Sequence, residues 1–207
     1  MYILKSQKYY SEDNYIEVIG MPASGKSTLV REMIDKYPSA VNVNERLPKG
    51  NLKRQMKKLI YIFFLFLKSP KVFVKDTKII ISSEQRSFKD LYAVLSNWHL
   101  IVYQSIYYGK SMNSKYIWDQ GLFQAIWSIY YSGLKDFDYM ELMVNKILPL
   151  KIYFTDADDK ELIRRANARG TNIRLNYNNK DDIERGRYAL DKTIQTIKHI
   201  GYTEMYL

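Results

Sequence analysis

The 207-residue sequence predicts an α/β fold in which a parallel sheet is covered on both faces by helices. Short apolar runs alternate along the chain with longer segments whose apolar residues recur at helical spacing. No internal repeat or low-complexity tract interrupts this order. A hydrophobic content of 46% over this length can supply one large core, so we expect a single domain over 1–207.

The N-terminal half of this pattern begins with a strand and a helix. Residues 15–19 form a short apolar run, and residues 28–36 follow with a single apolar stripe. Alternating apolar residues predict a second strand over 40–44. An apolar stripe over 52–67 predicts a helix, and we expect Ser69-Pro70 to close it.

The C-terminal half continues the alternation of strands and helices. Asp158 and Glu161 form a capping box at the start of one helix, and Gly201 supplies the end of another. Because parallel strands end at one edge of a sheet, we expect a ligand to bind at that edge. The predicted elements are, in order, a helix over 84–108, a strand over 116–118, helices over 122–131 and 139–148, a strand over 150–154, helices over 158–169 and 183–197, and a last strand over 202–206.

A glycine-rich segment lies between the first strand and the first helix. Residues 20–27 read GMPASGKS and match the pattern GxxxxGK(S/T). Such a loop turns backbone N–H groups toward phosphate oxygens, Lys26 reaches the outer phosphates, and the Ser27 hydroxyl can ligate magnesium. A glycine turn that feeds a helix is the alternative, but the strand before and the helix after favour phosphate binding. The candidate phosphate-binding residues are Gly20, Pro22, Ala23, Ser24, Gly25, Lys26, Ser27 and Thr28.

Composition and charge limit the classes of protein. The absence of cysteine excludes a disulfide framework and a thiolate metal site, and the first residues lack an export signal, so we expect a cytoplasmic protein. The formal charge of +10 indicates an anionic partner, and nucleic acid, lipid and phosphorylated small molecules all qualify. Because the sequence lacks zinc-finger, basic-heptad and RNA-binding signatures, we do not expect nucleic acid as the main ligand.

The longest apolar run covers nine residues, 59–67, whereas a helix that spans a membrane needs about 20. The segment is apolar all round and follows four basic residues between 53 and 58. It therefore suits a core helix, a helix that binds a partner, or a helix that rests on an anionic membrane surface. We favour the core helix and leave the other two interpretations open.

Two carboxylates follow predicted strands at the edge where a ligand would bind. Asp119 comes directly after the strand over 116–118, where it could hold magnesium or accept the proton of an acceptor hydroxyl. A helix N-cap is the alternative role for Asp119. Glu45 follows the strand over 40–44 and is a second candidate base, unless it is an exposed loop carboxylate paired with a lysine.

Basic side chains supply further candidates. Arg165 and Arg169 are four residues apart on one predicted helix, where like charges repel unless an anion lies between them. Paired guanidinium groups can stabilise the charge that develops during phosphoryl transfer, although a solvated basic face remains the alternative. Arg86 is a weaker candidate for binding an acceptor. His99 and His199, the only histidines in the sequence, are interpreted as structural or surface residues.

The order of these features resembles the nucleoside and nucleoside-monophosphate kinase group of P-loop proteins, which includes thymidylate kinases and deoxynucleoside kinases. The phosphate loop over 20–27 matches, and Asp119-Gln120-Gly121 is similar to the acidic motif that follows a strand in this group. Arg165 and Arg169, before Gly170, resemble an arginine-bearing lid helix. Of these motifs, the phosphate loop alone is specific by itself.

Two positions depart from the group. Glu45-Arg46 resembles the acidic base position of deoxynucleoside kinases, but the usual Glu-Pro is absent. Gln120 stands where members that act on nucleosides or nucleotides commonly carry arginine, so one clamp for a phosphate or a sugar is missing. This difference affects the identity of the acceptor and leaves the donor half intact.

The resemblance implies a P-loop NTPase fold with three α/β/α layers around a parallel sheet of about five strands. It also implies ATP and Mg²⁺ as the donor pair, an acceptor held by helices over 51–109, and a lid over 158–180. We therefore expect an ATP-dependent kinase. Its expected catalytic residues are Lys26, Asp119, Glu45, Arg165 and Arg169, its magnesium ligands are Ser27 and Asp119, and its acceptor-binding residues are Glu45, Arg46, Arg86 and Gln120.

The acceptor is expected to be a small molecule. A nucleoside or nucleotide comes first, and a sugar or other metabolite, for example from surface-polymer synthesis, comes second. A nucleotide-dependent scaffold that docks a membrane or a partner through 59–67 is the alternative from another class. A guanine-specific switch is disfavoured, because Asn145-Lys146-Ile147-Leu148 lacks the acidic residue of an NKxD motif. Formation of a homodimer stays open.

Overall fold

The computed structural model describes residues 3–5, 15–37, 39–46, 48, 50–108, 115–169 and 175–202. Within these residues, the chain forms a five-stranded sheet with the order β1-β5-β2-β4-β3. The strands are β1 (Ile3–Lys5), β2 (Tyr15–Gly20), β3 (Ala40–Asn42), β4 (Lys115–Trp118) and β5 (Lys151–Thr155). Four neighbouring strands are parallel, and β1 pairs with β5 in the antiparallel direction. The expectation of a fully parallel sheet is therefore wrong at this edge.

Strand β2 lies at the centre of the sheet and brings the site together. It pairs with β4 on one side and with β5 on the other, with Ile16 opposite Ile117 and Lys151. Val18 and Ile19 are buried on the two faces, as a central strand requires. Because all three strands run in the same direction, the segments after Gly20, Trp118 and Thr155 meet at one edge.

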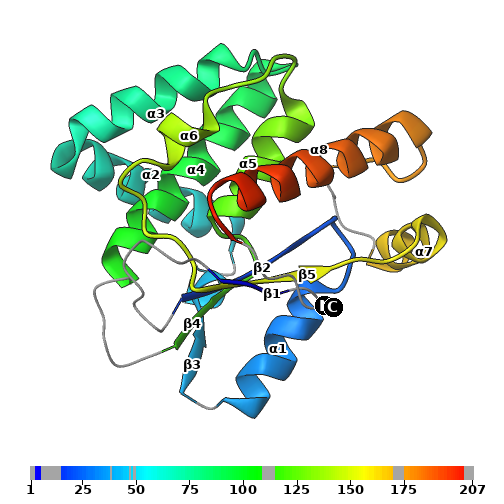
Figure 1. Cartoon of the computed structure of the whole chain (residues 1–207). Helices are drawn as coiled ribbons and strands as arrows, with labels where there is room; N and C mark the ends of the chain where they lie inside the picture. The colour runs from blue at the N-terminus through cyan, green and yellow to red at the C-terminus, as the bar shows by residue number, and fades with distance from the viewer. Residues whose placement is uncertain are drawn as a thin grey trace.

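Helices cover both faces of this sheet, as Figure 1 shows. Helix α1 (Lys26–Lys36) lies on one face, where Val30 packs with Val18 and Ile117. On the other face lie α4 (Phe88–Tyr108), α5 (Leu122–Ser132) and α8 (Lys180–His199). The larger core fills this second interface, around Trp98, Phe123 and Ile126. A mixed α/β fold with helices on both faces of its sheet is therefore confirmed.

The remaining helices extend this fold. Helices α2 (Asn51–Lys68), α3 (Pro70–Ser82) and α4 pack on one another, and α7 (Asp159–Arg169) follows β5. The expected end of the first of these helices at Ser69-Pro70 is confirmed, because α2 ends at Lys68 with Ser69 as its C-cap. Pro70 occupies the first turn of α3, where its missing N–H and fixed φ are tolerated.

Several predicted boundaries also differ from the structure. The strand predicted over 40–44 ends at Asn42, and a 3-10 helix (Val43–Arg46) follows, so Glu45 does not follow a strand directly. The helix predicted from residue 84 begins at Phe88, and the helix predicted over 139–148 is only α6 (Tyr139–Met143). Tyr202 is not in a strand, and 203–206 lie outside the described residues.

The two histidines have structural contacts. His99 is buried in α4, where its ring stacks on Phe73 and its Nε2 atom lies 2.9 Å from the Thr77 hydroxyl. Burial, together with the nearby Lys146 charge, lowers the pKa of His99 to about 4, so the ring is neutral at pH 7. His199 contacts the Tyr139 hydroxyl through Nδ1 at the end of α8. These positions agree with the structural interpretation.

Candidate phosphate-binding site

The segment from Gly20 to Ser27 forms a tight loop between β2 and α1. Ala23 and Gly25 have φ angles of 65° and 104°, in the left-handed region. Gly25 is the N-cap of α1, and its carbonyl oxygen accepts hydrogen bonds from the N–H groups of Thr28 and Leu29. The first turn of α1 contains no acidic residue, so the positive end of the helix dipole faces the loop without a competing carboxylate.

Gly20 is required by the close approach of β5. A Cβ atom at this position would clash with the carbonyl oxygen of Thr155 and with the hydroxyl oxygens of Thr155 and Ser24. These two hydroxyl oxygens lie 2.6 Å apart, and the Gly20 N–H donates to Gln124 Oε1 at 3.2 Å. The loop is therefore held from β5 on one side and from α5 on the other.

Lys26 folds back over the beginning of the loop. Its Nζ atom donates to the carbonyl oxygens of Gly20 and Met21, each at 2.8 Å. This position brings the ammonium group to the concave side of the loop, where it lines a cavity. A cation held there by backbone oxygens is suited to contact an anion that enters the cavity.

Ser27 and Asp119 lie side by side across the edge of the sheet. The Ser27 hydroxyl donates to Asp119 Oδ2 at 3.2 Å, and the Asn44 amide donates to Asp119 Oδ1. A hydroxyl and a carboxylate in this arrangement fit Mg²⁺, which is usually held by one or two protein oxygens together with substrate phosphates. Within the described ranges, no three His, Cys, Asp or Glu side chains cluster as a metal site.

Two cavities lie next to the loop. The inner cavity, of about 290 Å³, lies between the loop, α4 and α5. The outer cavity, of about 640 Å³, lies between the loop, α1, the end of β5 and α7. The inner cavity is lined by Pro22, Ala23, Gly25, Lys26, Ser27, Asn97, Ile101, Asp119, Gln120, Gln124, Ala125, Trp127 and Ser128. The outer cavity is lined by Ser24, Gly25, Thr28, Leu29, Glu32, Phe154, Thr155, Asp156, Arg164, Arg165 and Ala168.

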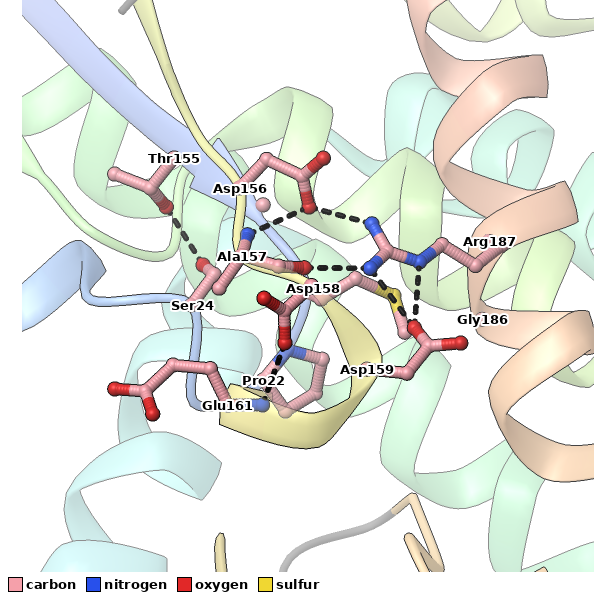
Figure 2. A network of polar contacts seen from close by, with 12 residues as sticks. Pro22, Ser24, Thr155, Asp156, Ala157, Asp158, Asp159, Glu161, Gly186 and Arg187 are labelled. Carbon is pink, nitrogen blue, oxygen red and sulfur yellow. Dashed lines mark hydrogen bonds and ion pairs between the residues drawn. The ribbon is translucent and has the colours of Figure 1, made fainter. Parts of the chain in front are cut away.

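A second polar network holds the start of α7 beside the loop (Figure 2). Arg187 of α8 donates to the Ala157 carbonyl oxygen at 2.6 Å and forms ion pairs with Asp156 and Asp159. The Asp158 carboxylate accepts from the Glu161 N–H at 2.8 Å, which confirms the predicted N-cap of this helix. Arg187 therefore ties the segment between β5 and α7 to α8.

The structure brings one lid arginine to the loop. A Cβ atom on Gly25 would lie 3.3 Å from Arg165 Nη1, so this guanidinium lies against the loop. Arg165 also donates to Glu161 Oε1 at 2.6 Å, as Arg164 does to the same carboxylate group. The side chain of Arg169 lies outside the described part of the chain, as does Gly170.

The predicted acceptor-binding residues lie in different parts of the structure. Gln120 lines the inner cavity. Glu45 has an exposed side chain in the 3-10 helix and lines neither cavity. Arg86 lines neither cavity either, and it donates to the Tyr131 carbonyl oxygen and lies over the Tyr131 ring. The side chain of Arg46 is not among those described.

Glu17 is a buried carboxylate that the sequence interpretation missed. It lies in the middle of β2, where it accepts from the Gln124 N–H at 2.8 Å and from the Tyr15 hydroxyl at 3.2 Å. Burial raises the pKa of Glu17 to about 7, against the backbone donors of α5, which favour the charged form. A Cβ atom on Gly121 would clash with this carboxylate, so Glu17 fixes the turn that carries Asp119.

Signals for the missed residues differ. A glutamate inside the apolar run over 15–19 was visible as an exception to the pattern of a buried strand. Asn44 and Gln124 carried no such signal, because their roles depend on the packing of β3 and α5 against the loop.

In sequence comparisons, the chain matches no family model and no curated protein. A proposal for the function therefore depends on the geometry of the loop and of the residues around it.

Proposed function

We propose that this protein is an ATP-dependent phosphotransferase of the P-loop NTPase fold that acts on a small-molecule acceptor. The observation that carries the proposal is the loop between β2 and α1, with Lys26 inside it and Ser27 against Asp119. A strand, a glycine loop and a helix in this order are the structural context that a GxxxxGK(S/T) match requires. The absence of cysteine makes a cytoplasmic location part of the proposal.

The two cavities suggest how donor and acceptor would lie. Lys26, Ser27 and Asp119 line the inner cavity, so the terminal phosphate of the donor would face it. Ser24, Gly25 and Thr28 line the outer cavity, together with Arg165. We therefore assign the outer cavity to the nucleoside part of ATP and the inner cavity to the acceptor.

The described residues can perform the steps that phosphoryl transfer needs. Positioning and electrostatic stabilisation supply nearly all of its catalysis. Lys26 would balance the charge that develops on the transferred group, and Arg165, against Gly25 on the side of the outer cavity, would contact the other donor phosphates. Asp119 is close enough to the loop to receive the acceptor proton. Glu45 is the less favoured base, because it lines neither cavity. Mg²⁺ held by Ser27 and Asp119 would neutralise charge on the donor phosphates.

The wall of the inner cavity indicates the kind of acceptor. Asn97, Gln120, Gln124 and Ser128 offer amide and hydroxyl groups that can bond to hydroxyls of a nucleoside or a sugar. Lys58 Nζ donates to Asn97 Oδ1 at 3.0 Å, so a cation lies directly behind this wall. We favour an acceptor that carries an anionic group as well as hydroxyls, such as a nucleotide or a sugar phosphate.

Arg54 strengthens the case for an anionic acceptor. Burial and the nearby Arg54 charge lower the pKa of Lys58, so the two cations repel each other in a half-buried position. In the part of the chain that the structure describes, neither Arg54 nor Lys58 forms an ion pair with a carboxylate. An anion in the inner cavity would relieve this repulsion.

An ATP-consumption assay over a panel of nucleosides, nucleotides and sugar phosphates tests the proposal. We expect turnover that depends on one acceptor class. Lys26→Met should lower kcat by at least about 100-fold, because the variant lacks the ammonium group that stabilises charge on the transferred phosphate. Lys36→Met, at the far end of α1, is the matched control and should retain activity. Full activity of Lys26→Met would contradict the proposal.

A nucleotide-dependent binding protein is the second candidate function. The large apolar side chains that α2 exposes favour this candidate, because an enzyme that acts only on small molecules needs no such surface. Nucleotide binding without turnover for any acceptor in the panel, or turnover that no acceptor changes, would support this candidate over the kinase.

A further inference from the structure

Helix α2 exposes an apolar face that no described part of the chain covers. Leu52, Met56, Phe63 and Leu67 are 78%, 55%, 58% and 57% exposed, and Leu59 and Phe66 are also exposed. The first five of these residues along the chain are three or four positions apart, and Leu67 is four after Phe63, so all six share one side of the helix, which we call the outer face of α2. The core-helix interpretation of 59–67 is therefore wrong for this side of the helix.

The opposite side of α2 explains why the helix is held in this orientation. Leu65 is buried in the main core, and the Tyr61 ring stacks on Tyr103 of α4 with their centroids 4.9 Å apart. Lys58 bonds to Asn97 of α4 on the same side. Because these contacts fix the rotation of α2, its outer face cannot turn inward without breaking them.

The helices that carry this apolar face are rich in positive charge. Residues 51–82, which form α2 and α3, contain eight lysines and arginines and a single acidic residue, Asp76. Asp76 is buried and paired with Lys146 at 3.1 Å, so it contributes no negative charge to the surface. Lys53 and Lys68 are exposed near the two ends of α2, with Lys53 beside the outer face and Lys68 farther round the helix.

We infer that the outer face of α2 is a docking surface for an anionic phospholipid membrane. A helix with an apolar side and lysines beside it lies in the plane of the interface, with its apolar side about 5–10 Å below the headgroups. The lysines then reach the negative headgroups, each adding to the attraction. Within the described residues, no helix has the length and apolar content to cross a bilayer, which leaves α2 at the surface.

The charge pattern argues against a second copy of this chain as the occupant. A symmetric dimer through the outer face would bring the same surface of both subunits together. Because α2 contains no acidic residue, its lysines would then lie near the identical lysines of the other subunit, with no carboxylate of α2 between them. An anionic lipid surface supplies the missing negative charge.

The position of α2 is compatible with an accessible site. Helices α2 and α3 lie at the opposite end of the helical layer from α7, as Figure 1 shows. The outer cavity is lined by α1, β5 and α7 residues, so docking through α2 leaves it open to solvent. The inference stands independently of the proposed kinase activity.

Co-sedimentation of the full-length chain with vesicles tests the inference. We expect binding to vesicles that mix phosphatidylcholine with phosphatidylglycerol, little binding to phosphatidylcholine alone, and weaker binding at high salt. Leu59→Gln combined with Phe63→Gln should lower the partition coefficient at least tenfold. Lys53→Gln combined with Lys68→Gln should lower it about 25-fold, at roughly fivefold for each lysine.

Matched controls separate this effect from a general loss of apolar surface or charge. Leu134→Gln with Tyr188→Gln removes two exposed apolar side chains elsewhere, and Lys180→Gln with Lys198→Gln removes two charges from α8. Both control proteins should bind the vesicles like the original chain, as should Lys26→Met. Circular dichroism checks that every variant is folded.

Three results would overturn the inference. The first is no binding to either vesicle type, and the second is undiminished binding by the Leu59/Phe63 variant. The third is that the original chain forms a dimer in analytical ultracentrifugation and does not bind vesicles, whereas the Leu59/Phe63 variant is a monomer. That last result would assign the outer face to a second copy.

Discussion

At the scale of single residues, the candidate site depends on groups that hold one another in place. Asp119 accepts from both Ser27 and Asn44, and the turn that carries it packs on the buried Glu17. Lys26 is held by two carbonyl oxygens of the loop that it serves. The contacts of Asp119 and Glu17 join residues far apart in the sequence, so a change at one of them should affect the others.

Glu17 makes stability depend on pH. Its pKa is about 7 in the folded protein and near 4.5 in an unfolded chain, so folding favours the protonated form. The stabilisation is full below the unfolded pKa and is lost as the pH rises through about 7. Between pH 4 and pH 8, this group should lower the free energy of unfolding by about 3 kcal/mol at most.

Urea unfolding at a series of pH values checks this prediction. Glu17→Gln removes the titrating group, so its free energy of unfolding should lack that part of the decrease between pH 4 and pH 8. Glu32→Gln changes an exposed carboxylate of α1 and serves as the control, with the profile of the original chain. Identical pH profiles for Glu17→Gln and the original chain would show that Glu17 does not titrate in this range.

Lys58 should affect the acceptor more than the donor. It lies behind the wall of the inner cavity, bonded to Asn97, and the outer cavity does not include it. Lys58→Met should raise KM for an anionic acceptor about tenfold and leave KM for ATP nearly unchanged, because the charge behind the wall and the hydrogen bond that orients Asn97 are both lost. Lys57→Met, whose ammonium lies over the Tyr61 ring, is the neighbouring control. Steady-state kinetics with each substrate varied separately measures both constants.

At the scale of elements, the sequence predicted the parts around the loop well and the helical region less well. The strand, loop and helix from 15 to 36 and the strand before Asp119 were found, because periodicity and the glycine motif agree there. Helix α3 was not found. Its Val72, Val74 and Ile79 are β-branched and favour strands locally, whereas packing of Phe73 and Ile80 against the core decides for a helix.

A buried ion pair connects α3 to the segment after α6. Asp76 and Lys146 lie 3.1 Å apart, and Trp98 of α4 donates to the same carboxylate at 2.8 Å. Removal of one partner leaves an unpaired charge in the core, so Lys146→Met should lower the free energy of unfolding by about 3–5 kcal/mol. Asp76→Leu combined with Lys146→Met removes both charges and should recover most of that loss.

Urea unfolding of the two single variants and the double variant, as a double-mutant cycle, measures the coupling. Lys75→Met provides the comparison, because Lys75 pairs with Glu141 on the surface of the same helix and should cost no more than about 1 kcal/mol. A double variant as unstable as the sum of both single variants would show that the two residues do not act as a pair.

At the scale of the whole molecule, the alternation of strands and helices predicted the fold class. It did not predict which apolar and charged residues lie on the surface. The sequence favoured a place in the core for 59–67 because this segment is apolar all round. Which side of a helix is buried depends on its neighbours, and α4 takes only the side with Tyr61 and Leu65. A net charge of +10 likewise indicated an anionic partner without locating it.

Binding of a ligand at the loop should stabilise the whole folded protein, because β5, α5 and α7 together hold the loop. A triphosphate that binds only the folded chain stabilises it by about 2.7 kcal/mol when present at about 100 times its Kd. We expect ATP with Mg²⁺ to raise Tm measurably, and EDTA to remove most of the increase, because Ser27 and Asp119 would contact phosphate through the metal. Lys26→Met should show a much smaller increase, and Lys36→Met should match the original chain. Differential scanning calorimetry measures all four cases, and an unchanged Tm with every nucleoside triphosphate tested would contradict the assignment of the loop as a phosphate site.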